Sequence, residues 1–153
     1  MAGQSITVSG TIAAPRERVW EVLTDLDNAA VTIASITAVE RLTDGPYAVG
    51  TRWRETRTML GRAETHELEV VEAAVSERTV VTALTDGVHY TTTMELDPDP
   101  VGTRLTLTFG ADQPDATRLQ RVMWTMMGPI GSLFTRRMLK QELAEVRAAA
   151  LQS

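Results

Sequence analysis

The sequence predicts an α+β fold, in which a curved antiparallel sheet of seven strands wraps around one long C-terminal helix. Three observations lead to this prediction. Apolar and polar residues alternate in short segments that are separated by turn signals, which is typical of strands. The links between most of these segments are hairpin-sized and too short for the crossovers of a parallel sheet. The apolar period changes to that of a helix over the C-terminal quarter of the chain.

The N-terminal segment predicts a strand followed by a helix. Ser5–Ile12 places apolar side chains on one face and hydroxyls on the other, as a half-buried strand does. Pro15 then begins a helix at a position where a missing N–H group costs nothing. The apolar side of this helix consists of Val19, Trp20, Val22, Leu23 and Leu26. Asn28–Ala34 is expected to form a short second helix or a turn.

Six further strands are expected between residues 35 and 109. Asp86-Gly87 is a typical two-residue hairpin turn, and Gly61 marks another hairpin. The six predicted strands are Ser35–Leu42, Thr51–Leu60, Arg62–Glu72, Thr79–Leu84, His89–Leu96 and Thr103–Phe109.

The C-terminal segment predicts a long helix from about Asp115, with Asp115 or Thr117 as its cap. Gly128 and Pro129 predict a kink within it. Its first apolar stripe consists of Leu119, Val122, Met123, Met126, Met127, Ile130, Leu133 and Phe134. A second stripe of Leu139, Leu143 and Val146 falls nearly opposite the first. Either the kink rotates the second half, or that half packs against something else.

Composition narrows the classes of function. The chain has 153 residues, enough for one domain (1–153) with a sizeable core. Its formal net charge of −5 argues against general affinity for nucleic acid, which needs a basic surface. No apolar run reaches the roughly 20 residues that span a bilayer, and the first ten residues lack a signal peptide pattern. With no cysteine, the chain fits a reducing cytoplasm.

No metal or cofactor is expected from the motifs. The two histidines, His66 and His89, have neither HxxxH nor HExxH spacing. The segment Gly128–Gly131 lacks the Lys-Ser/Thr pair of a phosphate-binding loop. The sequence sets no oligomeric state, and a homodimer is compatible with it.

Two local motifs carry a family resemblance. Ile12–Asp25 reads I-x-A-P-x-x-x-V-W as it passes from the first strand into the first helix, and Val49–Trp53 reads V-G-T-x-W. With the long final helix, they resemble the START-like superfamily, also called Bet v 1-like, SRPBCC or helix-grip. Within it, the chain is most similar to the polyketide cyclase/dehydrase and lipid-transport family. The resemblance implies a cavity between the sheet and the long helix that holds lipids, sterols, aromatic polyketides or similar molecules.

One strand carries the most informative candidate residues. In Thr51–Leu60, residues two apart share a face. One face holds Arg52, Arg54, Thr56 and Thr58, and the other holds Trp53, Glu55, Arg57 and Met59. Because the first face is wholly polar, it is expected to meet water, and the second is expected to point inward. Glu55 and Arg57 then pair with each other or with a ligand, since a buried charge is costly alone. The alternative is that both charges reach solvent at the mouth of the pocket.

The neighbouring strand, Arg62–Glu72, is expected to point Glu64, His66, Leu68 and Val70 inward. His66 would then be a candidate general acid or base, with Glu64 or Glu55 orienting it. The alternative is that His66 only satisfies a hydrogen bond within the fold.

Further candidate ligand contacts lie on another strand and on the long helix. Tyr90, Thr92 and Met94 share one face of His89–Leu96, and the two hydroxyls bind either a ligand or the neighbouring backbone. Met123, Met126, Met127 and Phe134 lie on the first helical stripe, where methionine suits an adaptable apolar surface. The same spacing also describes an ordinary core.

Three functions are compatible with these residues. The first is binding of a small hydrophobic molecule, with Glu55, Arg57, His66 and Tyr90 holding its polar end. The second is a polyketide aromatase/cyclase or dehydratase, in which His66 or Glu55 transfers protons and Arg57 or Tyr90 stabilises an enolate. The third is a protein-interaction module whose cavity has collapsed.

Overall fold

A computed structural model describes residues 4–59, 61–85, 88–112 and 129–152. All seven predicted strands are confirmed, each within a few residues of its expected bounds. The short region after α1 contains a 3-10 helix and one turn of α-helix. In chain order the elements are β1 Gln4–Ile12, α1 Arg16–Thr24, η1 Leu26–Asn28, α2 Ala29–Thr32, β2 Ile36–Arg41, β3 Arg52–Met59, β4 Arg62–Ala74, β5 Arg78–Thr85, β6 Val88–Pro98, β7 Thr103–Asp112 and α4 Pro129–Ala150.

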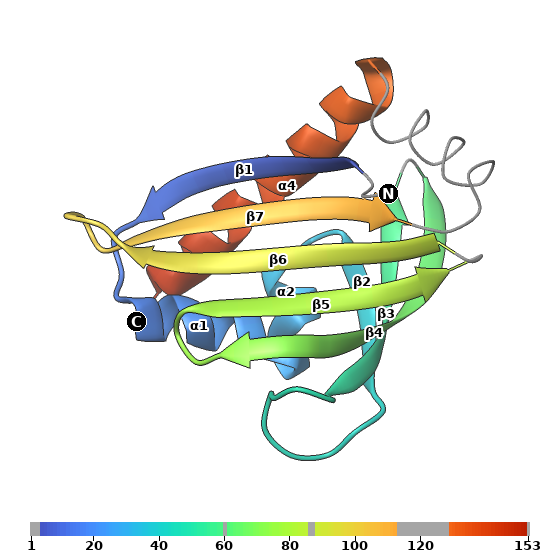
Figure 1. Ribbon diagram of the computed structural model, residues 1–153, viewed down its shortest axis with the longest axis horizontal. Coiled ribbons are helices and arrows are strands. Elements are labelled where there is room, and N and C mark those ends of the chain that lie inside the picture. Colours follow the sequence, from blue (N-terminus) through green and yellow to red (C-terminus); the bar gives the residue numbers. More distant parts are fainter. Residues whose placement is uncertain (1–3, 60, 86–87, 113–128, 153) are drawn as a thin grey trace.

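The strands form one antiparallel sheet in the order β1-β7-β6-β5-β4-β3-β2. β2 to β7 follow chain order, and β1 adds beside β7 at the far edge. The sheet curves so that α4 lies behind it, while β2 and β3 turn round toward the helical side (Figure 1). This is the predicted arrangement of a sheet gripping a helix.

The predicted second stripe of the C-terminal helix packs against the sheet. Leu139, Leu143 and Val146 are buried, and they share a core cluster with residues of β1, β6 and β7. The second half of the C-terminal helix therefore contacts the sheet through this stripe. The predicted cap, the kink at Gly128-Pro129 and most of the first stripe lie outside the described residues.

α4 also covers the free edge of β1. Arg136 and Arg147 donate hydrogen bonds to the carbonyl oxygens of Thr7 and Thr11, at 3.1 and 3.0 Å. Unpaired strand edges invite pairing with other chains, so these arginines occupy acceptors that would otherwise be open. Gly10 allows this close approach, because a Cβ there would lie 2.8 Å from Arg147 Nη2.

A second, smaller core lies under β3 to β5. Leu26, Trp53, Val70 and Val81 are buried together. Tyr47, from the loop between β2 and β3, packs its ring against Trp53 at a centroid distance of 6.4 Å. Burial raises the pKa of the Tyr47 phenol, and a hydrogen bond with the Thr79 hydroxyl at 2.7 Å partly offsets that rise.

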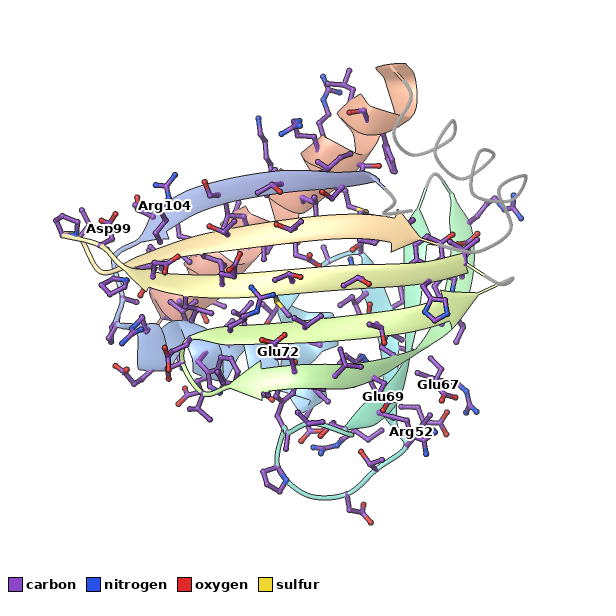
Figure 2. The ribbon with its side chains drawn as sticks, viewed as in Figure 1. Arg52, Glu67, Glu69, Glu72, Asp99 and Arg104 are labelled. Atoms are coloured by element: carbon purple, nitrogen blue, oxygen red, sulfur yellow. The ribbon has the colours of Figure 1, made fainter. Side chains whose placement is uncertain are left out.

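The outer face of β3 and β4 is charged, as the alternation predicts. Arg52 pairs with Glu67 at 3.3 Å and Arg54 pairs with Glu40 at 3.0 Å. Figure 2 shows Arg52, Glu67 and Glu69 gathered on neighbouring strands, away from α4. The opposite face of β3 must therefore meet the interior.

Candidate functional site

β3 presents its second face to the space between the sheet and α4. Trp53 is only 4% exposed. The register of β3 with β4 sets Glu55 opposite His66, and Arg57 opposite Glu64. The predicted inward direction of Trp53, Glu55 and Arg57 is therefore confirmed by burial and by partners. β3 is the second strand from the sheet edge.

Glu55 and Arg57 form an ion pair, and α4 supplies a second carboxylate. Arg57 Nε donates to Glu55 Oε2 at 2.7 Å, and Arg57 Nη2 donates to Glu142 Oε1 at 2.7 Å. Glu55 Oε1 also accepts a hydrogen bond from Trp53 Nε1 at 3.3 Å. Arg57 Nη1 lies 3.4 Å from Ser35 Oγ. The network joins β3 to the long helix and to the segment before β2.

The surroundings keep Arg57 cationic. Burial by itself lowers the pKa of a guanidinium, but the charges of Glu142 and Glu55 outweigh it and raise the pKa of Arg57 above its ordinary value. The side chains of Arg57, Glu55 and Glu142 are 23%, 12% and 18% exposed. They are thus largely removed from water while retaining a surface that another molecule could contact.

His66 lies beside the carboxylate of Glu64. The distance between His66 Nε2 and Glu64 Oε2 is 3.4 Å, and the His66 side chain is 31% exposed. Glu64, one of the two carboxylates predicted to orient His66, therefore lies next to its ring. Glu55 faces His66 across the strands but directs both of its oxygens to Arg57 and Trp53.

The middle of the concave face is only partly covered. Tyr90 stacks on Phe109 of β7, with ring centroids 6.0 Å apart and planes inclined by 18°. Tyr90, Thr92, Met94 and Phe109 are all half-buried, although β6 and β7 are interior strands with a neighbour on each side. Further along the same strands and the same face, Leu96, Leu105 and Leu107 are fully buried. Along β6 and β7 the larger side chains of the concave face are therefore fully buried at one end and half-buried from Met94 to Tyr90.

The remaining predicted contacts divide into two groups. Phe134 lies on α4 and is half-buried. Met123, Met126, Met127 and the side chain of Met59 lie outside the part of the chain that the structure describes.

Among the described residues, no group of three or more acidic or histidine side chains could hold a metal ion. In that same part, no helix is long and apolar enough to cross a bilayer.

Sequence reasoning missed Glu142. It belongs to a helix 85 residues away from Arg57 in the chain, and its partner depends on how that helix is rotated against the sheet. A signal was present, because Glu142 is flanked by Leu139, Leu143 and Val146 at helical spacing. A carboxylate beside a buried stripe needs a partner. Phe109, which stacks on Tyr90, was likewise recognised only as a strand residue.

A separate hollow of about 260 Å³ lies on the helical side of the molecule. It is bordered by α1, α2 and the end of α4, and its lining includes Arg18, Glu21, Val31 and Gln152. Arg18 donates hydrogen bonds to the carbonyl oxygens of Ala149 and Gln152, both at 3.0 Å. These bonds satisfy groups that a helix C-terminus leaves open. None of the predicted ligand contacts lines this hollow.

Comparison with known proteins agrees with this architecture. Residues 3–151 match the family described as polyketide cyclase / dehydrase and lipid transport, so the chain belongs to that family. No curated protein sequence matches the chain.

Solved structures share its fold at low identity. TTHA0849 from Thermus thermophilus is 17% identical with a TM-score of 0.77, and 97% of each chain is covered. The Zhui aromatase/cyclase from Streptomyces sp. R1128 is 18% identical with a TM-score of 0.76, covering 97% of this chain and 93% of that one. Ara h 8.0201 is 9% identical with a TM-score of 0.74, and 99% of each chain is covered. These likenesses show the helix-grip fold.

Proposed function

We propose that this chain, as one domain spanning residues 1–153, binds a small and largely hydrophobic molecule between the concave face of the sheet and α4. The observation that carries the proposal is the incomplete cover over part of β6 and β7. Tyr90, Thr92, Met94 and Phe109 would be fully buried in a packed interior, yet they are half-buried. Ligand sites combine such apolar surface with a few convergent polar groups, and the network around Arg57 supplies these.

In this proposal Trp53, Tyr90, Met94 and Phe134 contact the apolar body of the ligand. Met59, Met123, Met126 and Met127 stay predicted contacts. Glu55, Arg57 and His66 lie at the polar end, and Thr92 offers a hydroxyl near the centre of the sheet. The partial exposure of the concave face counts against a collapsed cavity, which the protein-interaction alternative requires.

A pair of adjacent threonines provides the test. Thr92 is on the concave face, opposite Phe109, whereas Thr93 is on the outer face, opposite Thr108. Thr92→Phe should fill the proposed site and abolish binding of N-phenyl-1-naphthylamine, a neutral probe that fluoresces in apolar surroundings. Thr93→Phe adds the same ring on the other side of the sheet and should leave binding unchanged. Equal binding by both variants and the parent protein would place the probe elsewhere and refute the proposal.

Native mass spectrometry of freshly purified protein adds an independent readout. A small molecule that co-purifies with the parent protein and with Thr93→Phe, but not with Thr92→Phe, would identify the ligand class directly.

An enzymatic role is a second candidate, supported by the histidine–carboxylate pair on the concave face. His66 lies 3.4 Å from Glu64, an arrangement that suits proton transfer. The family description includes cyclases and dehydrases. His66→Ala should then abolish turnover of a polyketide-like substrate while retaining its binding. If the parent protein binds the substrate tightly but does not turn it over, the enzymatic role is excluded and only the binding function stands.

A further inference from the structure

The polar end of the proposed site carries more negative than positive charge. Glu55 and Glu142 both contact Arg57 at 2.7 Å, so two carboxylates share one guanidinium. Glu64, opposite Arg57 on β4, is 50% exposed and turns its carboxylate to His66 at 3.4 Å, so it does not join the two carboxylates on Arg57. The positive charge of Arg57 is therefore more than balanced before any ligand arrives.

The donors of Arg57 are also largely engaged. Each of its three nitrogens already faces an oxygen: Nε faces Glu55, Nη2 faces Glu142, and Nη1 faces Ser35. A ligand carboxylate at this position would bring a further negative charge next to the two carboxylates that already contact Arg57. Like charges in a poorly solvated site repel strongly.

Acceptor capacity, by contrast, is left over. Glu142 Oε1 accepts from Arg57, while Glu142 Oε2 has no hydrogen-bond partner among the described residues. The Glu142 side chain is 18% exposed, so it is mostly shielded from bulk water without being sealed off. An ionised carboxylate can accept several hydrogen bonds, so this oxygen suits an incoming donor.

We propose that Glu142, together with Glu55, makes this site selective for hydrophobic molecules that carry a protonated amine, and makes it reject hydrophobic carboxylates. The inference rests on the proposed function and adds the chemical class of the ligand's polar end. An ammonium group would donate to Glu142 Oε2 and bring the local charge closer to zero. Glu142 is thereby a specificity-determining residue supplied by α4.

The test uses three competitors with the same apolar body: 2-naphthylmethylamine, 2-naphthylmethanol and 2-naphthoate. Each displaces N-phenyl-1-naphthylamine from the full-length protein near neutral pH. The amine should compete at a concentration at least about tenfold lower than the carboxylate, with the alcohol between them. Glu142→Gln should narrow this ratio. Glu55→Gln combined with Glu142→Gln should reverse it, because Arg57 then keeps its positive charge without the two carboxylates that contact it.

Glu67→Gln is the matched control. It removes the same charge from the outer face of β4, where Glu67 pairs with Arg52, and it should keep the ratio of the parent protein. Equal competition by the amine and the carboxylate, or an equal change of the ratio by Glu67→Gln and Glu142→Gln, would overturn the inference while ligand binding stands. A probe that does not bind the parent protein would overturn the proposed function itself. The ratio in the parent protein decides the matter even if a double variant does not fold.

Discussion

Replacing Arg57 with methionine should destabilise the protein substantially, because it leaves two poorly solvated carboxylates without their common partner. Removing one partner of a fully buried ion pair costs about 3–5 kcal/mol. Here the three side chains are 12% to 23% exposed, and water partly screens the orphaned charges. We therefore expect a loss of about 2–3 kcal/mol in the free energy of unfolding. For a chain of this size, that corresponds to a fall in Tm of about 5–10 °C.

The control is the same substitution at Arg54, on the other face of the same strand. Arg54 pairs with Glu40 at 3.0 Å, but these side chains are 49% and 68% exposed. An exposed pair contributes less than about 1 kcal/mol, so Arg54→Met should have a small effect. Urea denaturation of the two variants and the parent protein measures the difference. Equal losses for Arg57→Met and Arg54→Met would refute the assignment of Arg57 to a shielded network.

Three further predictions concern the framework around the site. Gly102→Ala should lower the free energy of unfolding, measured by urea denaturation, by at least about 2 kcal/mol, because the new Cβ would lie 2.5 Å from the backbone oxygen of Ile12. An unchanged free energy of unfolding would contradict that packing. Thr103→Val should cost about 1–2 kcal/mol, since the buried Thr103 hydroxyl donates to the Ala14 oxygen at 2.8 Å, and a neutral result would mean that this carbonyl finds another donor. Burial raises the pKa of the Tyr47 phenol above 10.0, so the unfolded state loses the phenol proton at a lower pH than the folded state, and the free energy of unfolding falls as pH rises past 10.0. Tyr47→Phe should make this alkaline fall in stability shallower. An unchanged dependence of stability on pH would exclude Tyr47 as a contributor.

The strands were predictable because their signal is local. Alternation along Thr103–Phe109 or Ser5–Ile12 depends on residues two apart, and pleating itself puts those residues on one face. The same rule assigned Trp53, Glu55 and Arg57 to the interior, since the opposite face of β3 held only polar side chains. Which partner Glu55 and Arg57 would take could not be decided, because two-residue periodicity describes direction and says nothing about what lies opposite.

The helix side of the site shows the complementary case. The two stripes of the C-terminal helix were visible in the sequence, but their opposition left its rotation against the sheet undetermined. In the structure Leu139, Leu143 and Val146 pack into the main core, and that rotation brings Glu142 to Arg57. Tyr90 and Phe109 likewise meet only because the register sets β6 beside β7.

The sequence by itself determined the order of the elements, the antiparallel sheet and the inward face of β3, because each depends on spacing within a short segment. Only the tertiary structure decided that Arg57 is shared by Glu55 and Glu142, and that larger side chains such as Tyr90 and Phe109 on the concave face keep accessible surface. Both depend on how a helix packs across a curved sheet, which sums many weak contacts between residues far apart in the chain. The excess of negative charge around Arg57, on which the proposed preference for amines rests, arises from this packing of α4 against the sheet.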